Sequence, residues 1–492
     1  MKRILNPETL TSHGNIAGRK AVLEILEAGM QAADPYNNVF KLMRVEGHKL
    51  IVGYPAFEPP GGPQSGEEEI DLNQVGRIFV LGAGKGVQRT AKAIEEILGD
   101  RLTGGHVIDK HGGEKILQKI GVTFGAHPVP DEGCVQGSQQ ILEMTRDLRP
   151  DDLVFTIICN GVSSLLTLPA PGISLEDVRQ TTYIFQIEKG GQTIDLTPIR
   201  NHLDQLKGGK LTAHIQPARA IHLIAFRRRT YKDLMHHRIN RWLHTLPDYL
   251  TYADAVDSLK KWDAWDAVPA SVREHLLRAD PAQETLSLED FNKTRFRIFC
   301  TMPDELGMLH AARQKAIELG FTPHVLYNNH VMQPEAGQIG KFVANLAIHS
   351  SASGDPFEPP CALFGRGEMV VTVGNKKGMG GRNQEYALRA ALELAPTDNI
   401  VMGSVDSDGT DGPGKQFIDG YDDIPVLSGA IVDGSTVARA RELGLNLYDE
   451  LKEHNTSPPL YKLGDGVIAV PGIAMGDLSV TLVLGRGSYI PT

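Results

Sequence analysis

The segment RIFVLGAGKGVQRTAKAIEEILG, residues 77–99, decides the fold of the first half of this chain. It passes from a short apolar strand through a glycine cluster that holds one lysine and then into a helical pattern. In such a unit the glycines let the backbone approach a ligand, and the helix N-terminus points free N–H groups at an anion. We interpret Gly84, Lys85 and Gly86 as a phosphate or oxyanion corner, with a glycine turn beside a solvated lysine as the structural alternative.

Two familiar nucleotide motifs do not fit this segment. The phosphate loop of nucleoside triphosphatases needs Ser or Thr after its lysine, whereas Gly86 follows Lys85. The dinucleotide fingerprint needs a third glycine where Val87 stands. The segment therefore indicates anion binding without indicating which nucleotide.

Apolar strands alternate with helical patterns outward from this segment. In the first half an amphipathic helix is expected at residues 17–30, followed by the strands HVID (106–109), LVFTII (153–158) and AIHLIAF (220–226). Residues 227–293 carry all three tryptophans and no clear strand, and are expected to form helices and loops between two domains. A second series is expected from RFRIFC (295–300) through HVLY (324–327), EMVVTV (368–373), NIVMGSV (399–405) and LSVTLVLG (478–485). This alternation predicts α/β domains whose mostly parallel sheets carry helices on both faces.

Bulk composition limits the class of protein. A chain of 492 residues suits two large domains, and a hydrophobic fraction of 41% with 22% charged residues is typical of a globular protein. The net charge of −10 argues against a general nucleic-acid binder, although residues 227–238 are locally basic. Four cysteines without a C-x-x-C pair suit a reducing compartment. No apolar run reaches the ~18 residues of a membrane helix and no signal peptide is apparent, so we expect a cytoplasmic protein without a membrane partner.

Polar residues follow two of the expected strands in the first half. Because ligands of doubly wound domains lie beyond the carboxyl ends of the strands, these positions are candidates for substrate or phosphate binding. The loop CNGVSS supplies an amide and hydroxyls, and the stretch IRNHLDQLKGGKL supplies cations beside flexible glycines. A simple turn and an exposed, glycine-capped helix end are the structural alternatives. The candidates are Asn160, Ser163, Ser164, Arg200 and Lys207.

The second half contains a sharper pair of motifs. A glycine-rich loop after EMVVTV leads into a helix that begins near Gly381, Arg382 and Asn383, where an arginine fork and a helix dipole suit phosphate or carboxylate. The loop DSDGTDGPG places Asp408 and Asp411 among glycines. Closely spaced carboxylates invite Mg²⁺, and a turn of solvated aspartates is the alternative.

Taken together, these motifs resemble the type-2 glycerate kinases (the GckA/TtuD, or MOFRL, family). GMGGRNQE, DGTDGPG and IVDGST are similar to its C-terminal, MOFRL-type domain. GAGKG, AHPVPDE, LPAPGISLED and IRNHLDQLKGGKL are similar, in the same order, to its N-terminal, DUF4147-type domain. The resemblance covers nearly the whole chain.

The resemblance implies two α/β/α three-layer domains with mostly parallel or mixed sheets and a cleft between them. We place a Rossmann-like domain at residues 1–290 and a MOFRL-like domain at residues 291–492. The implied activity is ATP-dependent phosphorylation of D-glycerate at its 2-hydroxyl, or of a related small sugar acid, with Mg²⁺. The catalytic pair proposed for the family falls on Lys85 and Arg382. No sequence feature fixes the oligomeric state, and a homodimer is compatible with it.

Two segments depart from the family pattern. CNGVSS stands in place of a triple-glycine loop, and AFRRRTYKDLMHH in place of an S-D-V-x-G-D strand end. Asn160 and Val162 then leave less backbone open to an anion, and Arg227, Arg228 and Arg229 make the local field more positive. We therefore expect a longer sugar acid to be a better substrate than D-glycerate. The alternatives are an NAD(P)-dependent reductase of hydroxypyruvate or another 2-keto acid, and a non-catalytic sugar-acid or nucleotide-binding protein.

Overall fold

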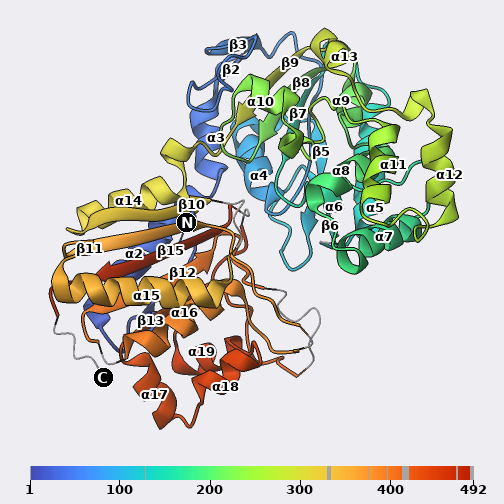
Figure 1. Cartoon of the computed structure of the whole chain (residues 1–492). Coiled ribbons are helices and arrows are strands. Elements are labelled where there is room, and N and C mark those ends of the chain that lie inside the picture. Colours follow the sequence, from blue (N-terminus) through green and yellow to red (C-terminus); the bar gives the residue numbers. More distant parts are fainter. Residues whose placement is uncertain are drawn as a thin grey trace. The chain divides into compact units, whose positions relative to one another are not determined.

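The chain folds into two compact units (Figure 1). The computed structural model describes residues 2–127, 129–329, 334–374, 376–395, 397–412, 420–472 and 475–487. The inserted unit is Pro35–Pro303, and the terminal unit joins Met1–Asp34 to Asp304–Thr492. Parts of three motifs lie outside the described residues, namely Pro128, Asn375, Pro413 and Gly414.

This division differs from the boundary expected near residue 290. The strand RFRIFC, expected to open the second domain, is β9 (Phe296–Cys300), which pairs in parallel with β8 (Arg219–Ile224) and completes the first sheet. The helix expected at residues 17–30 forms as α2 (Ile16–Ala32), but it packs with the C-terminal part of the chain. Both differences depend on packing between segments that are distant in the sequence. A local sequence pattern does not predict such packing.

The inserted unit contains a parallel sheet of six strands in the order β6-β5-β4-β7-β8-β9. Numbered from its first strand, this is the order 3-2-1-4-5-6 of dinucleotide-binding folds, with the switch point between β4 and β7. The remaining strands of this sheet are β4 (Ile78–Ala83), β5 (Gly104–Lys110), β6 (Gly121–Gly125) and β7 (Leu153–Ile158). A small antiparallel sheet consists of β1 (Met43–Glu46), β2 (Lys49–Val52) and β3 (Glu68–Asp71).

Helices connect the strands of the inserted unit. They are α3 (Tyr36–Leu42), α4 (Val87–Leu98), α5 (Glu132–Thr145), α6 (Val162–Leu165), α7 (Leu175–Tyr183), α8 (Thr193–His202), α9 (Lys210–Ile215), α10 (Tyr231–His236), α11 (Tyr252–Lys261), α12 (Ala270–Arg278) and α13 (Leu288–Lys293). Short turns of helix follow at η1 (Gly99–Arg101), η2 (Ile184–Glu188), η3 (Arg238–Asn240) and η4 (Pro281–Gln283). Residues 227–293, expected between the domains, therefore lie within this unit.

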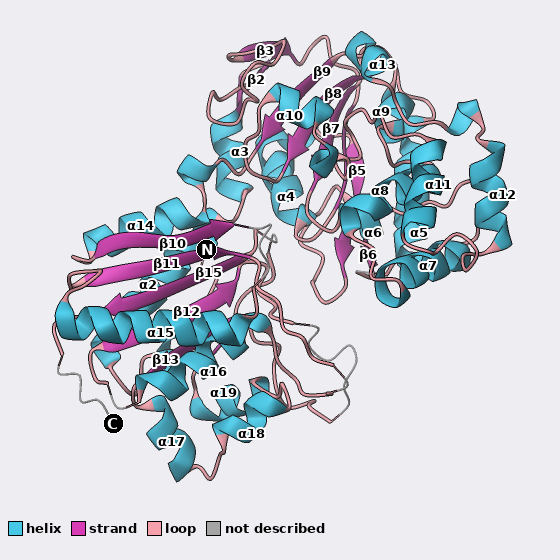
Figure 2. Cartoon of the chain, viewed as in Figure 1, coloured by secondary structure: helices cyan, strands magenta, loops and turns pink. Residues whose placement is uncertain are grey.

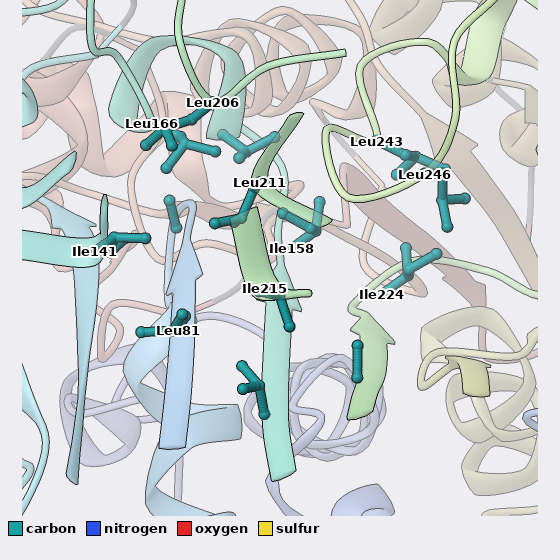
Figure 3. Close-up of a cluster of buried hydrophobic side chains, with 14 of the residues drawn as sticks. Leu81, Ile141, Ile158, Leu166, Leu206, Leu211, Ile215, Ile224, Leu243 and Leu246 are labelled. Carbon is teal, nitrogen blue, oxygen red and sulfur yellow. The ribbon is translucent and has the colours of Figure 1, made fainter. Parts of the chain in front are cut away.

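Two apolar clusters support the inserted unit. One lies on the sheet, where Figure 3 shows Leu211 and Ile215 of α9 beside Ile158 of β7. The other joins α7, α8, α11 and α12 and buries residues such as Phe185 and Leu259. The fully apolar burial of β7 explains why its run reads as a continuous hydrophobic strand.

The terminal unit contains a mixed sheet of six strands in the order β10-β11-β15-β12-β13-β14. Only β10 and β11 pair in parallel, and the other four pairs are antiparallel. The strands are β10 (Thr322–Asn329), β11 (Cys361–Gly367), β12 (Ile400–Asp406), β13 (Gly429–Asp433), β14 (Gly466–Val467) and β15 (Asp477–Val483).

Helices cover both faces of this mixed sheet (Figure 2). Alternate residues of β12 face opposite sides, so Gly403 meets Val22 of α2 while Met402 packs in the cluster formed with α15 and α16. The helices are α1 (Pro7–Leu10), α2, α14 (Met308–Glu318), α15 (Ala336–Ser353), α16 (Arg382–Leu394), α17 (Thr436–Glu442), α18 (Leu447–Lys452) and α19 (Ser457–Leu463), with the short turn η5 (Asp304–Leu306). The predicted α/β class with helix-covered sheets is confirmed.

One expected strand is wrong. EMVVTV forms no ladder, and the strand before the glycine-rich loop is β11. The amide of Met369 instead donates to Asp477 Oδ2, and the amide of Val370 donates to the Pro334 carbonyl. The apolar run is thus held by single contacts at the edge of the site described below.

Two bulk expectations can be compared with the structure. All four cysteines are free and buried, as expected for a chain without disulfides. Within the described ranges, no helix combines the length and the apolar character that crossing a membrane requires.

A buried ion-pair network ties α2 to the C-terminal strands. The Arg19 guanidinium is completely buried, and its Nε lies 2.5 Å from Asp433 Oδ2 while its Nη1 lies 2.9 Å from Asp465 Oδ1. Asp465 also accepts from His13 and Arg439. Burial alone would raise the pKa of Asp433, but the Arg19 guanidinium outweighs it and lowers this pKa to about 2.

The lowered pKa of Asp433 predicts a pH-dependent contribution to stability. Its carboxylate stabilises the folded state by about 2 kcal/mol above pH ~4, and this contribution is lost as the pH falls from ~4 towards ~2. The difference in unfolding free energy between wild type and Asp433→Asn should therefore be larger at pH 6 than at pH 3. Urea unfolding followed by circular dichroism measures it, since the three tryptophans all lie in the inserted unit.

The control for this prediction is Asp449→Asn, which removes an exposed carboxylate of the terminal unit. It should change the unfolding free energy by less than ~1 kcal/mol at either pH. An equal effect of Asp433→Asn at pH 6 and pH 3 would contradict the role assigned to the Arg19 pair.

Candidate functional site

The loops after β4 and β7 meet at the switch point of the parallel sheet. The Lys85 amide donates to the Asn160 carbonyl at 2.8 Å, which joins the two loops directly. Gly84 has a φ of +128°, and a Cβ at this position would come within 2.5 Å of the Cys159 carbonyl oxygen. The sequence is therefore restricted to glycine here because two backbones approach closely.

The amide N–H groups of the predicted phosphate corner are already used within the protein. Gly84 donates to the Ile108 carbonyl, and Gly86 donates to Asp109 Oδ1 at 2.8 Å. Asp109 lies at the end of β5, is buried, and also accepts from the backbone of Gln88, so its carboxylate caps α4. The prediction that this helix N-terminus offers free donors to an anion is wrong, because a side chain from the neighbouring strand fills that position.

The Lys85 side chain lies close to Gly161, which follows β7. A Cβ added at Gly161 would lie 3.2 Å from Lys85 Cγ and 3.1 Å from His127 Cδ2. His127 follows β6, so residues after three parallel strands come together around Gly161. The switch point thus contains the predicted Lys85 together with His127, which sequence reasoning did not single out.

The CNGVSS loop divides its side chains between core and site. Val162 is fully buried in the apolar cluster, so its side chain does not narrow the anion-binding space as expected. Ser164 is buried and donates to the Ala126 carbonyl at 3.0 Å. Asn160 and Ser163 remain half-buried, and Ser163 Oγ lies 2.9 Å from His244 Nε2.

The two predicted carboxylate-binding cations have different surroundings. Lys207 is buried, and its Nζ contacts Asp204 Oδ2 at 2.5 Å and Thr167 Oγ1 at 3.0 Å, so its charge is satisfied internally. Arg200 is half-buried, and its side chain makes no hydrogen bond or ion pair with the residues that the structure describes. Desolvation lowers the pKa of Arg200 to about 10. Arg200 rather than Lys207 is therefore the cation available to an anionic ligand.

A second buried lysine supports the KGGK turn. Lys210 Nζ donates to the carbonyls of Asn201 and Gln283 at 2.8 and 3.0 Å. Burial lowers the pKa of Lys210 to about 8. Gly208 and Gly209 have φ values of +64° and +82°, which explains the glycine pair of this motif.

The terminal unit holds Arg382 in a fixed fork. Its Nε lies 2.8 and 2.9 Å from the two oxygens of Asp477, and its Nη2 lies 2.6 Å from Asp406 Oδ2. Glu368 Oε1 lies 3.8 Å from Nη1, and the Arg382 side chain remains partly exposed. Burial lowers the pKa of Arg382, but the carboxylates of Asp406 and Asp477 outweigh it and raise this pKa. The group is therefore a permanent cation that carboxylates hold in place and that remains partly exposed.

Asp477 is the main partner of Arg382 and was not found from the sequence. It starts β15 and is almost completely buried, and burial raises its pKa despite the adjacent guanidinium. Its oxygens also accept from the amide of Met369 and from Asn383 Nδ2. The only signal in the sequence is a Gly-Asp pair before an apolar run, which many turns share.

Asp411 caps α16 instead of presenting a free carboxylate. Its Oδ1 accepts from the amide and Nδ2 of Asn383, and its Oδ2 accepts from the amide and Nε2 of Gln384, at 2.9 to 3.1 Å. A Cβ at Gly381 would lie 2.3 Å from Asp411 Cγ, so glycine is needed for this approach. Asn383 and Asp411 are therefore used inside the protein, and the predicted Mg²⁺ role of Asp411 has no free oxygen to support it.

Asp408 lies on the same loop and binds the residue two positions later. Its Oδ1 accepts from the amide and hydroxyl of Thr410 at 2.9 and 2.7 Å. The part of the chain that the structure describes contains no group of three or more His, Cys, Asp or Glu side chains arranged to hold a metal ion. These residues do not form a protein cage for a divalent cation.

The basic AFRRR segment follows β8 as expected. Arg228 Nη1 donates to the Pro55 carbonyl, and the amide of Met302 donates to the Phe226 carbonyl. The segment is thus tied to the loop after β2 and to the residues after β9. It lies at the same carboxyl edge of the sheet as the switch point, two strand positions from β4.

Two protein families match this chain. The family described as "Domain of unknown function (DUF4147)" matches residues 21–226, and the MOFRL family matches residues 361–475. The glycerate 2-kinase of Pyrococcus horikoshii is 31% identical over 95% of this chain and 98% of its own length. A putative hydroxypyruvate reductase of Agrobacterium vitis is 28% identical over 83% of this chain and 100% of its own length.

A solved structure has a similar fold. The crystal structure of a glycerate kinase from Thermotoga maritima is similar with a TM-score of 0.71 and 27% identity. The likeness covers 95% of this chain and 100% of that chain.

The capping role of Asp411 predicts a large effect on stability. Asp411→Ala should lower the unfolding free energy of the terminal unit by about 3 kcal/mol, because it removes a helix cap and takes one acceptor away from each of two buried amide side chains. Urea unfolding followed by circular dichroism measures this change. Asp398→Ala, which removes an exposed carboxylate of the same unit, is the control and should cost less than ~0.5 kcal/mol. Equal effects of the two substitutions would show that the cap contributes little.

Proposed function

The chain belongs to the glycerate 2-kinase family that combines DUF4147 and MOFRL regions, and we propose that it transfers a phosphoryl group from ATP to the 2-hydroxyl of D-glycerate. The observation that carries this proposal is the likeness to a glycerate 2-kinase over 95% of the chain, which includes both units. A related small sugar acid is the alternative substrate.

Lys85 and Arg382 are the proposed catalytic cations. Phosphoryl transfer depends mostly on positioning and on neutralising charge on the transferred group. The Arg382 fork is held by Asp406 and Asp477, so it needs little reorganisation when charge develops. Lys85 supplies a flexible point charge at a switch point, where ligands of doubly wound sheets bind.

Arg200 and Ser163 are the proposed ligands of the substrate carboxylate. Arg200 is a half-buried residue whose side chain makes no ion pair with the described residues, and an arginine fork matches a carboxylate in two hydrogen bonds. Lys207 would contribute only to the local positive field, because Asp204 neutralises it directly. The predicted preference for longer acids now rests on Asn160 and the AFRRR segment, since Val162 lies in the core.

Mg²⁺ would enter with the nucleotide as part of the substrate. Mg²⁺ in phosphoryl-transfer sites keeps several waters and is held by one or two carboxylates together with the phosphates. Among the residues predicted to hold it, Asp408 is the one whose carboxylate is not used to cap a helix. The proposal therefore assigns most of the metal's coordination to the phosphates and water, with Asp408 as the protein ligand.

The reductase alternative is disfavoured by the cap of α4. A dinucleotide pyrophosphate sits at the N-terminus of the first helix of such a fold, where backbone N–H groups point at it. Here the Asp109 carboxylate accepts those hydrogen bonds and would repel a pyrophosphate. The strand order alone therefore does not argue for NAD(P).

The first test is direct assay of the reaction. With ATP and Mg²⁺, D-glycerate should release ADP and yield the 2-phosphate, identified by phosphorus NMR, and removal of Mg²⁺ should abolish turnover. Comparing kcat/KM over three-carbon to six-carbon acids identifies the preferred substrate. Oxidation of NADH or NADPH by hydroxypyruvate, without ADP release in the first assay, would support the reductase instead. Binding without either reaction would support a non-catalytic protein.

The second test concerns the two cations. Lys85→Met and Arg382→Ala should each lower kcat by at least about a hundredfold, as expected for losing a transition-state cation. If both act on the same phosphoryl group, the double variant should be little slower than the slower single variant.

Two controls accompany the cation variants. Lys119→Met changes an exposed lysine just before β6, at the amino edge of the sheet, and Arg389→Gln changes a later residue of α16. Both should keep kcat within about threefold of wild type. Near-normal turnover in Lys85→Met or Arg382→Ala would remove that residue from the mechanism.

A further inference from the structure

A buried histidine supports the serine proposed to contact substrate. His244 is 1% exposed, and its Nε2 lies 2.9 Å from Ser163 Oγ. Its carbonyl accepts the amide of Gly209 at 3.0 Å, so one residue connects the CNGVSS loop with the KGGK turn. Neither the glycine motifs nor the serine loop draws attention to it in the sequence.

The surroundings of His244 keep its ring neutral. Burial lowers its pKa well below the ordinary value, and the nearby charges of Lys207, Arg200 and Lys210 lower it further. Its Nδ1 is buried and has no hydrogen-bond partner among the described residues. A neutral ring therefore has one protonated nitrogen, and only Nε2 has a partner to which it can donate.

The unpartnered Nδ1 decides the direction of the hydrogen bond. A buried N–H without an acceptor is rarer than a buried acceptor without a donor, so the favoured tautomer carries its proton on Nε2. Nε2 then donates to Ser163 Oγ. The hydroxyl proton of Ser163 is left to be donated elsewhere, and no described residue receives it.

We propose that His244 is a positioning residue that fixes the Ser163 hydroxyl as a hydrogen-bond donor to the carboxylate of the bound sugar acid. The proposal rests on the proposed function and names a residue outside the motifs that define the family resemblance. Ser163 is half-buried, so a ligand can reach it, whereas His244 itself is enclosed. Arg200, whose charge acts on His244, supplies the second donor to the same carboxylate.

The inserted unit offers a matched comparison for this pair. His222 of β8 is also buried, its Nδ1 lies 2.7 Å from Thr156 Oγ1, and its Nε2 is likewise unpartnered. Thr156 is completely buried inside β7 and cannot contact a ligand. The two histidines thus make the same kind of hydrogen bond, but only His244 holds the hydroxyl of a residue that is partly exposed.

The experiment compares variants of both pairs by steady-state kinetics with D-glycerate and ATP. Ser163→Ala and His244→Leu should each raise the KM for D-glycerate about tenfold, the cost of one lost hydrogen bond to a charged group, with the KM for ATP unchanged. The double variant should be no worse than either single variant, because both remove the same interaction. His244→Gln retains an amide donor and should restore most of the affinity.

His222→Leu is the control for loss of a buried histidine. It should lower Tm without changing either KM, whereas His244→Leu changes the KM for D-glycerate. Multiplying effects in the double variant, or a KM for D-glycerate unchanged by His244→Leu, would overturn the proposal. If His244→Leu does not fold, Ser163→Ala and His244→Gln decide the question, and an unchanged KM in Ser163→Ala overturns it.

Failure of the proposed function gives a different result. A wild-type protein that phosphorylates no sugar acid contradicts the kinase assignment and leaves the positioning role to be measured by calorimetry with D-glycerate. Ser163→Ala and His244→Leu should then weaken Kd by the same factor, with His222→Leu unchanged. Equal Kd values for wild type and His244→Leu, or no binding by the wild type, would overturn the role of His244.

Discussion

The buried guanidinium of Arg19 is the constraint on which the arrangement of the chain depends. It is fully enclosed and can remain so only while Asp433 and Asp465 neutralise it, because an unpaired buried charge costs several kcal/mol. These carboxylates are more than 400 residues away in the sequence. The N-terminal helix is therefore committed to the C-terminal sheet, and the chain between them, Pro35–Pro303, must form a unit of its own.

Arg382, the proposed catalytic cation, is held by the same chemistry as Arg19. Asp406 and Asp477 fix its orientation, but they also offset much of its charge, as Asp433 and Asp465 do for Arg19. Its partial exposure is what distinguishes it from the enclosed Arg19. We infer that such a partly neutralised arginine attracts a bare phosphate weakly and suits a phosphate that is already complexed with Mg²⁺.

The sequence predicted the residues that lie at the carboxyl ends of the strands. It did not predict the contacts that residues on neighbouring strands make with them. Lys85 and the CNGVSS loop were expected at one edge because the carboxyl ends of parallel strands meet there, and the structure joins them. Asp109 and Asp477 contact their partners from adjacent strands. A local motif does not predict the order in which the strands pair in the sheet. For the same reason an apolar run such as EMVVTV resembled a strand although among the described residues it forms only one isolated bridge, between Val370 and Glu335. Val162 was misjudged because the direction of a side chain in a short helix depends on the helix start.

The insertion of one unit into the other also has a consequence for synthesis on the ribosome. Val22, Ile25 and Leu26 of α2 pack against a sheet whose last strand ends at Val483. At 5–20 residues per second, the roughly 450 residues between the end of α2 and that strand take about 20 to 90 s to translate. The helix α14, which packs on α2, is translated earlier in this interval, but the strands β12 and β15 that also pack on α2 come long after Pro35–Pro303. The apolar face of α2 therefore lacks its partner strands until late in synthesis, whereas the inserted unit contains its own complete sheet much earlier.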